Sequence, residues 1–141
     1  MQFNAYLQCL SDFKLIQRKS QFCKASDFEH GGSKNELLVA AKQIARAIRE
    51  RDGGLPGVKS IGWYIPDLDV VQVSCNLTKP FETGVCEVFQ TVQKQAMTLG
   101  YLAPDSELIG CIPERQFEIC TPSTLGLGRF KPMTPDRILP Y

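Results

Sequence analysis

The stretch from residue 60 to residue 77 reads SIGWYIPDLDVVQVSCNL and predicts two strands joined by a turn at Pro66 and Asp67. Side chains alternate across a strand, so each strand should have two different faces. One face is expected to enter a core and is apolar: Ile61, Trp63, Ile65, Val71, Val73, Cys75 and Leu77. The other face carries amide, hydroxyl and phenol groups together with a glycine: Ser60, Gly62, Tyr64, Gln72, Ser74 and Asn76.

The polar face has two interpretations. It is either the solvated side of an antiparallel sheet or one wall of a binding site. Gly62 would let another backbone or a ligand come close.

Helices are predicted on both sides of this hairpin. The sequence from Ser33 to Glu36 fits a capping box, apolar residues then recur at helical spacing, and Gly53 and Gly54 end the helix. A second helix is predicted with Thr83 as its N-cap and Gly100 as its left-handed C-terminal residue.

Two further strands complete the pattern. A strand is expected from Ser106 to Pro113, ended by the proline, and the range from Gln2 to Cys9 is the best local candidate for a first strand. The resulting order βαββαβ predicts an α+β, ferredoxin-like fold with two helices on one face of a four-stranded antiparallel sheet. The expected organisation is a poorly patterned segment (1–32), an α+β domain (33–120) and a Pro/Gly-rich tail (121–141) that runs across the surface.

The amino-acid composition limits the classes of binding partner that we expect. Over 141 residues, 16 basic and 15 acidic residues leave a formal charge of +1, so no charge excess drives binding to nucleic acid or to an anionic membrane. No apolar run reaches about 18 residues, and the first ten residues do not resemble a secretory signal. We therefore expect a cytoplasmic protein.

Six cysteines are spread along the chain without a CxxC pair, which predicts free thiols that pack as small hydrophobic groups, and no metal site. The single histidine, His30, is expected in a solvated loop. Arg49 is interpreted as either a solvated helix-end residue or an anion clamp, and Glu107 as either a solvated strand-end residue or an acceptor for the donor edge of a ligand.

Four segments together resemble the C-terminal subdomain of the glutamate formimidoyltransferase family. They are ARAIRERDGGLPGVKSIGWY (45–64), QVSCNLT (72–78), SELIGCIP (106–113) and TPDRILPY (134–141). After Pro113 that family continues with a long helix, whereas this chain passes into a Pro/Gly-rich stretch.

The resemblance implies a function. Members of that family move a formimino group from N-formimino-glutamate to tetrahydrofolate in histidine degradation, and some relatives transfer a formyl group. Their two subdomains stack sheet to sheet around the folate, and the catalytic histidine comes from the N-terminal subdomain, which no segment of this chain matches. The expectation is therefore a folate-binding subdomain with tetrahydrofolate as co-substrate, which does not catalyse transfer alone.

The expected folate-binding residues come from the polar face, the last strand and the end of the first helix: Arg49, Ser60, Gly62, Tyr64, Gln72, Ser74, Asn76, Glu107 and Gly110. The expected partners are a separate N-terminal formiminotransferase subdomain or a second copy of the chain. Two alternatives stay open at this point. One is a non-catalytic ferredoxin-like interaction or dimerisation module. The other is a truncated product that folds poorly because its first strand is absent.

Overall fold

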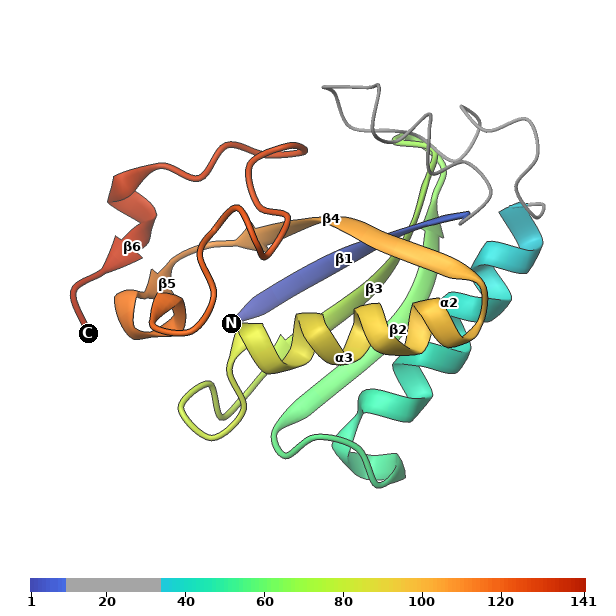
Figure 1. The fold of residues 1–141 in the computed structure, drawn as a ribbon, viewed down its shortest axis with the longest axis horizontal. Coiled ribbons are helices and arrows are strands. Elements are labelled where there is room, and N and C mark those ends of the chain that lie inside the picture. Colours follow the sequence, from blue (N-terminus) through green and yellow to red (C-terminus); the bar gives the residue numbers. More distant parts are fainter. Residues whose placement is uncertain (10–33) are drawn as a thin grey trace.

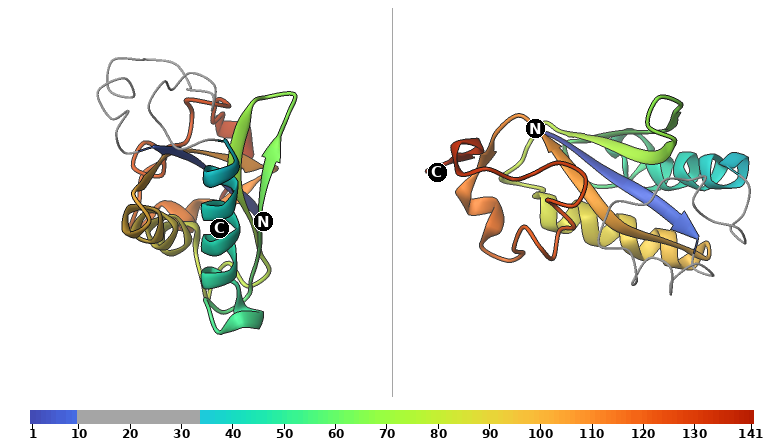
Figure 2. Two further views of the ribbon diagram at one scale, coloured as in Figure 1. Left: turned by 90° about the vertical axis from the view of Figure 1, so that its right-hand side faces the viewer. Right: turned by 90° about the horizontal axis from the view of Figure 1, so that it is seen from above.

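The computed structural model describes residues 1–9 and 34–141 and shows two helices packed on one face of a four-stranded antiparallel sheet (Figures 1 and 2). The main elements are β1 (Gln2–Cys9), α2 (Lys34–Ile48), β2 (Val58–Ile65), β3 (Val70–Leu77), α3 (Val85–Thr98) and β4 (Tyr101–Ile109). The strand order β2-β3-β1-β4 is that of the ferredoxin-like fold, so the predicted fold class is confirmed. The predicted loop histidine His30 and the capping residue Ser33 lie outside the described residues.

β1 is a central strand, paired with β3 on one side and with β4 on the other. Its apolar side chains Phe3, Ala5 and Leu7 all point into the core between sheet and helices. The first strand is therefore present where the sequence placed it, and the hypothesis of a sheet that lacks this strand is wrong.

The core joins both helices to the sheet. Ile44 and Ile48 of α2 and Phe89 of α3 are almost completely buried. The Phe89 ring meets Phe3 of β1 edge to face, with ring centroids 5.6 Å apart. This contact ties α3 directly to the central strand.

Helix α3 begins one residue later than the sequence suggested. Its N-cap is Gly84, whose lack of a capping side chain is compensated from elsewhere: Gln116 Oε1 accepts a hydrogen bond from the Val85 amide at 3.0 Å. Thr83 is buried and is not the cap. Gly100 adopts φ +84°, in agreement with its predicted left-handed conformation.

Strand β4 also differs from its predicted range. It starts at Tyr101 and ends at Ile109, because Gly110 turns the chain with φ +82°. Pro104 is tolerated inside it because β4 is an edge strand. Ile112–Pro113 forms a separate short strand, β5, which pairs in parallel with β6 (Ile138–Leu139) near the C-terminus.

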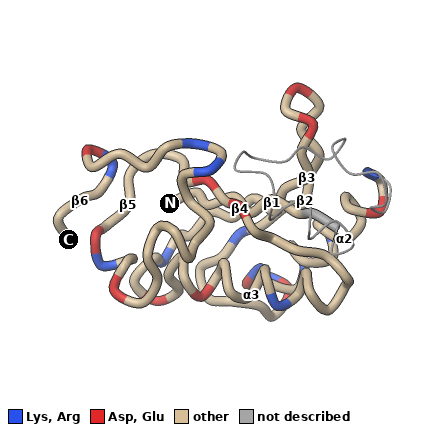
Figure 3. The backbone as a smooth tube through the Cα atoms, turned by 45° about the horizontal axis from the view of Figure 1, so that its top comes forward, with Lys and Arg blue, Asp and Glu red and all other residues tan. Residues whose placement is uncertain are grey.

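The C-terminal segment, which we define as residues 121–141, is not simply an extended surface tail. Leu125 is fully buried in the core, and the Ser106 amide donates a hydrogen bond of 2.9 Å to the Gly126 carbonyl along the free edge of β4. Short 3₁₀ helices precede it at Glu114–Phe117 (η4) and lie within it at Pro135–Arg137 (η5); another, Glu50–Asp52 (η3), follows α2. Figure 3 shows acidic and basic residues interspersed along the same helices and loops.

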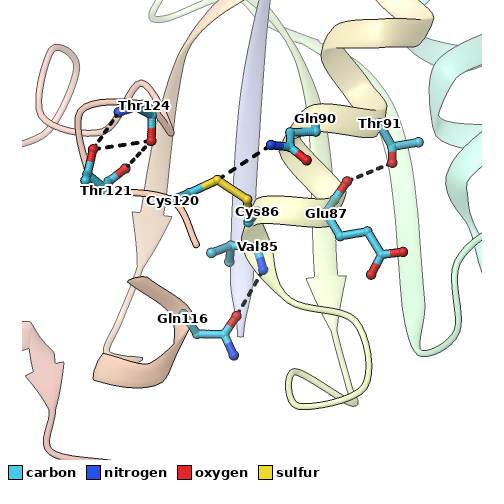
Figure 4. Close-up of a disulfide and its surroundings, with 9 residues drawn as sticks. All are labelled: Val85, Cys86, Glu87, Gln90, Thr91, Gln116, Cys120, Thr121 and Thr124. Carbon is cyan, nitrogen blue, oxygen red and sulfur yellow. Dashed lines mark hydrogen bonds between the residues drawn. A yellow bond between two sulfur atoms is a disulfide. The ribbon is translucent and has the colours of Figure 1, made fainter. Parts of the chain in front are cut away.

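Two cysteines are joined, contrary to the prediction of free thiols. Cys86 of α3 and Cys120 form a disulfide with their Cα atoms 5.7 Å apart (Figure 4). They are separated by 34 residues in sequence, so only the tertiary structure brings them together. Cys75 is a free buried thiol, as expected, and Cys111 is free but exposed.

Candidate functional site

The pairing of β2 with β3 decides which residues share the sheet face that the helices leave uncovered, here called the open face. Ser60 pairs with Cys75, Gly62 with Val73, and Tyr64 with Val71. Directly paired residues point to the same side of a sheet, and Cys75 and Val73 lie in the core. The prediction that Ser60, Gly62 and Tyr64 share a face with Gln72, Ser74 and Asn76 is therefore wrong.

Gly62 does allow a close approach, but it is the approach of helix α2. A Cβ atom added to Gly62 would lie 2.4 Å from the carbonyl carbon of Ala41 and from the amide nitrogen of Lys42. Ser60 likewise turns inward, with its Oγ 3.6 Å from Cys75 Sγ. Both residues serve packing between helix and sheet.

Tyr64 is held by its own hairpin. Its hydroxyl donates to Asp69 Oδ1 at 2.7 Å, and this hydrogen bond raises the pKa of Tyr64 because it stabilises the protonated phenol. Lys34 Nζ lies 4.4 Å from the ring centroid, in cation–π geometry.

The open face carries Gln72, Ser74 and Asn76 as predicted, joined by two apolar residues that the sequence had placed in the core. Ile61 is 55% exposed and Trp63 is 43% exposed. Four residues, 66–69, separate the paired residues Ile65 and Val70. The odd-numbered residues of β2 therefore face the same side of the sheet as the even-numbered residues of β3. Alternation within each strand could not reveal that offset.

Strands β1 and β4 add polar groups to the same face. Asn4 pairs with both Ser74 and Glu107, and its Nδ2 donates to Glu107 Oε1 at 3.0 Å. Trp63 Nε1 donates to Gln72 Oε1 at 2.6 Å. Sequence reasoning missed Asn4, although its polar side chain alternates with the core residues Phe3 and Ala5, which is the signal that could have identified it.

Tyr6 and Asp105 also belong to the open face, where they are paired with each other, and both are buried. Burial is the main cause that raises the pKa of each, and the nearby Glu107 adds to the effect on Tyr6. Arg129 Nη1 lies 3.1 Å from Asp105 Oδ1 and partly opposes the shift. The Phe130 ring packs on Tyr6 with centroids 4.9 Å apart, so the C-terminal segment covers this end of the open face.

The other end of the open face is hollowed. A depression of about 530 Å³ is lined by Gln2, Lys59, Ile61, Ser74 and Asn76, among others, and Gln2 Nε2 donates to Ser74 Oγ at 3.4 Å. Ser60 reaches its margin from the buried side of β2. These residues place amide, hydroxyl and ammonium groups around the exposed side chain of Ile61, and the exposed Ile109 also lines the depression.

Arg49, Glu107 and Gly110, which were also predicted as site residues, do not line this depression. Arg49 lines a second hollow of about 420 Å³ with Arg51 and Lys59, and it forms an ion pair with Asp52 that lowers the pKa of that carboxyl. Glu107 is buried against Asn4. The Gly110 carbonyl accepts a hydrogen bond from Arg137 Nε at 3.0 Å. The structure therefore brings together Ser74 and Asn76, with Gln72 beside them, and separates the others.

Among residues 1–9 and 34–141, no group of three or more His, Cys, Asp or Glu side chains is arranged to hold a metal ion. In the same part of the chain, no helix has the length and apolarity needed to cross a membrane. The side chains of the open face can orient a ligand with hydrogen-bonding edges and a flat surface.

Comparison with known proteins gives one consistent result. The model of a family described as the formiminotransferase domain matches residues 32–121. A glutamate formimidoyltransferase of Thermoplasma acidophilum is 40% identical over 78 residues, which are 55% of this chain and 26% of that protein.

Two other relatives agree. A formimidoyltransferase-cyclodeaminase of Dictyostelium discoideum is 37% identical over 79 residues, 52% of this chain and 15% of that protein. A glutamate formimidoyltransferase of Streptococcus pyogenes serotype M1 is 32% identical over 75 residues, 53% of this chain and 25% of that protein. The chain thus aligns with about a quarter or less of the length of these relatives.

Proposed function

This chain belongs to the formiminotransferase domain family, and we propose that its open sheet face binds the folate co-substrate of formimino transfer, tetrahydrofolate. The donor is expected to be N-formimino-glutamate, in histidine degradation, and the location cytoplasmic. The observation that carries the proposal is the depression in which exposed Ile61 lies beside Ser74 and Asn76.

The chemistry of this surface suits a pterin ring. A pterin is flat and carries hydrogen-bond donors and acceptors along its edge, so it needs an apolar contact and a few well-placed polar groups. Ile61 and Trp63 offer exposed apolar surface, while Ser74 and Asn76 offer a hydroxyl and an amide. The Trp63 indole is oriented by its bond to Gln72.

Glu107 and Arg49 play different roles in this proposal. Glu107 lies beside Asn4 on the neighbouring strand β4 and accepts its side-chain hydrogen bond, so it holds Asn4 in place at the edge of the polar wall. Arg49 lies in the adjoining hollow, which shares Lys59 and Ile61 with the depression, where its charge suits an anionic part of the ligand. Gly110, Ser60, Gly62 and Tyr64 are not retained as ligand contacts, because the structure uses them for packing and for bonds within the chain.

Replacing Asn76 with alanine is expected to weaken tetrahydrofolate binding about five- to tenfold, the effect of losing one hydrogen bond of about 1 kcal/mol. The melting temperature should stay unchanged because Asn76 is exposed. The measurement is a titration followed by Trp63 fluorescence. Thr91→Ala, at a partly buried position of α3 away from the open face, is the control and should bind as the wild type does. Equal loss of affinity and stability would make Asn76 structural, and a wild type that does not respond to high tetrahydrofolate would contradict the proposal.

Catalysis by these 141 residues alone is not expected. The attacking amine of the acceptor must lose a proton, and a general base must lie within hydrogen-bond reach of it. The described part of the chain contains no histidine, and its buried acids Asp105 and Glu107 are engaged with Arg129 and Asn4. We therefore propose that a histidine-bearing N-terminal subdomain completes the site across the open face.

A complementation assay tests this second part. The chain alone should give no formimino transfer above background, and adding a separately produced N-terminal formiminotransferase subdomain that carries the proposed histidine should produce measurable turnover. Loss of the general base alone accounts for a rate reduction of about 10²–10⁴-fold. Turnover by the isolated chain at the rate of the full-length relative would contradict the proposal.

The second candidate function is a ferredoxin-like dimerisation module, and the exposure of Ile61 and Trp63 on one face favours it. Light scattering after gel filtration distinguishes the two. A stable dimer that tetrahydrofolate does not dissociate would support the module, and a monomer that binds tetrahydrofolate would support the folate wall.

A further inference from the structure

We propose that the Cys86–Cys120 disulfide is a reversible thiol–disulfide site that controls whether the C-terminal segment stays fastened to the sheet. This goes beyond folate binding, since it concerns a covalent bond outside the depression. The bond joins the first turn of α3 to the residue immediately before the C-terminal segment.

Besides the disulfide, two side-chain amides hold this part of the chain at α3. Gln116 Oε1 accepts from the Val85 amide at 3.0 Å (Figure 4), and its Nε2 donates to the Pro80 carbonyl at 2.7 Å. Gln90 Nε2 donates to Cys120 Sγ at 3.8 Å. Without the disulfide, these non-covalent contacts and the packing of Phe117 on the core are what remain to hold the chain between η4 and Cys120 against α3.

Beyond Cys120 the segment reaches the open face. Leu125 fills a place in the core, the Gly126 carbonyl accepts from the Ser106 amide, and Arg129 and Phe130 then contact Asp105 and Tyr6. Gly126 is pressed against β4, since an added Cβ would lie 2.4 Å from the Pro104 carbonyl oxygen. The disulfide thus anchors the start of the segment that buries Tyr6 and Asp105.

The bond is reachable by a small reductant. Each of the two cysteines is 7% exposed, and Cys86 lines an open depression of about 250 Å³ beside Phe81 and Ile119. Phe81 is 61% exposed and Ile119 is 86% exposed, so the depression opens to solvent on the side of these two residues. The disulfide thus lies at the edge of the core, with Cys86 next to this opening.

The reaction is a two-electron exchange with a dithiol reductant. A thiolate of the reductant attacks Cys86 Sγ, the cysteine that lines the depression, the bond between the two cysteines breaks, and Cys120 leaves as a thiolate that then takes up a proton. The second thiol of the reductant displaces Cys86 from the mixed disulfide, so the reductant ends as a disulfide and the protein as two thiols. Cys86 leaves readily in this second step because it lies in the first turn of α3, where helix amide groups stabilise a thiolate.

The test uses the full chain, oxidised and then treated with dithiothreitol, with hydrogen exchange read by mass spectrometry. Reduction should accelerate exchange in peptides spanning residues 121–130 and at the Ser106 amide by about tenfold or more, because local opening governs exchange there. Peptides from β3 should not change. Reoxidation with oxidised dithiothreitol should restore the slow exchange.

Variants separate the disulfide from general effects of the reductant. Cys120→Ser should exchange like the reduced wild type in both conditions, and Cys111→Ser, which removes an exposed free thiol, should respond as the wild type does. Should Cys120→Ser fail to fold, the comparison of reduced and oxidised wild type still decides. Free, alkylatable Cys86 and Cys120 in oxidised protein, or identical exchange in the two redox states, would overturn the proposal.

Discussion

Gly62→Ala is expected to destabilise the domain by about 3 kcal/mol or more, which is the upper range for adding volume to a packed interface. The new Cβ would lie 2.4 Å from backbone atoms of Ala41 and Lys42, and backbone in the middle of a helix cannot turn aside as a flexible side chain can. Helix α2 would have to move away from β2 and lose part of the burial of Ala41 and Ile44. Urea unfolding followed by far-ultraviolet circular dichroism measures the change.

The matched control is Ser74→Ala, a small change on the open face of the neighbouring strand, which should alter stability by about 0.5 kcal/mol or less. The comparison also tests the face assignment. If Gly62 faced a ligand, its alanine variant would keep its stability and lose tetrahydrofolate affinity. That outcome would contradict the register of β2 and β3 described above.

Phe89→Ala is expected to cost about 3–5 kcal/mol, the range for removing a buried aromatic ring from a core. Phe89 is 1% exposed and packs edge to face on Phe3. Loss of the ring leaves a cavity between α3 and the central strand β1, whose Asn4 and Tyr6 side chains belong to the opposite, open face. We therefore expect weaker tetrahydrofolate binding as well, as a consequence of a loosened β1.

Thermal unfolding and urea titration measure this prediction. Thr91→Ala provides the control on the same helix, because Thr91 lies outside the buried face of α3, is only partly buried, and bonds the Glu87 carbonyl one turn earlier. Its change should stay within about 0.5 kcal/mol. A Phe89→Ala protein as stable as Thr91→Ala would mean that α3 does not pack on β1 through this ring.

Both helices, all four main strands and their order could be predicted from local patterns. Each helix and strand packs one side against a neighbouring layer, so its apolar residues recur with the period of that element. Ile44 and Ile48 recur at helical spacing, and residues 71–77 alternate as in a strand. The left-handed Gly100 could be predicted for a similar reason, because a helix end is a local event. The domain boundaries at residues 32 and 120 remain predictions.

The candidate site could be predicted only in part. Gln72, Ser74 and Asn76 were placed on the correct face because they alternate with core residues in one strand. Trp63 and Ile61 were placed on the wrong face because alternation shows two faces of a strand without showing which of them meets the core. A polar Ser60 can be buried beside Cys75, and an apolar Ile61 can be exposed, when the pairing of strands requires it.

By itself, the sequence determined the βαββαβ order and the polar face of β3, since these follow from interactions between residues close along the chain. Tertiary structure alone decided the offset across the β2–β3 turn, the use of Gln116 to cap α3 and the disulfide between Cys86 and Cys120. It also decided that Arg129 and Phe130 would cover Asp105 and Tyr6. The β2–β3 offset depends on the length of the turn at residues 66–69, which alternation within either strand does not record. The other contacts join segments distant in sequence, and no local period of the chain records which distant segments meet.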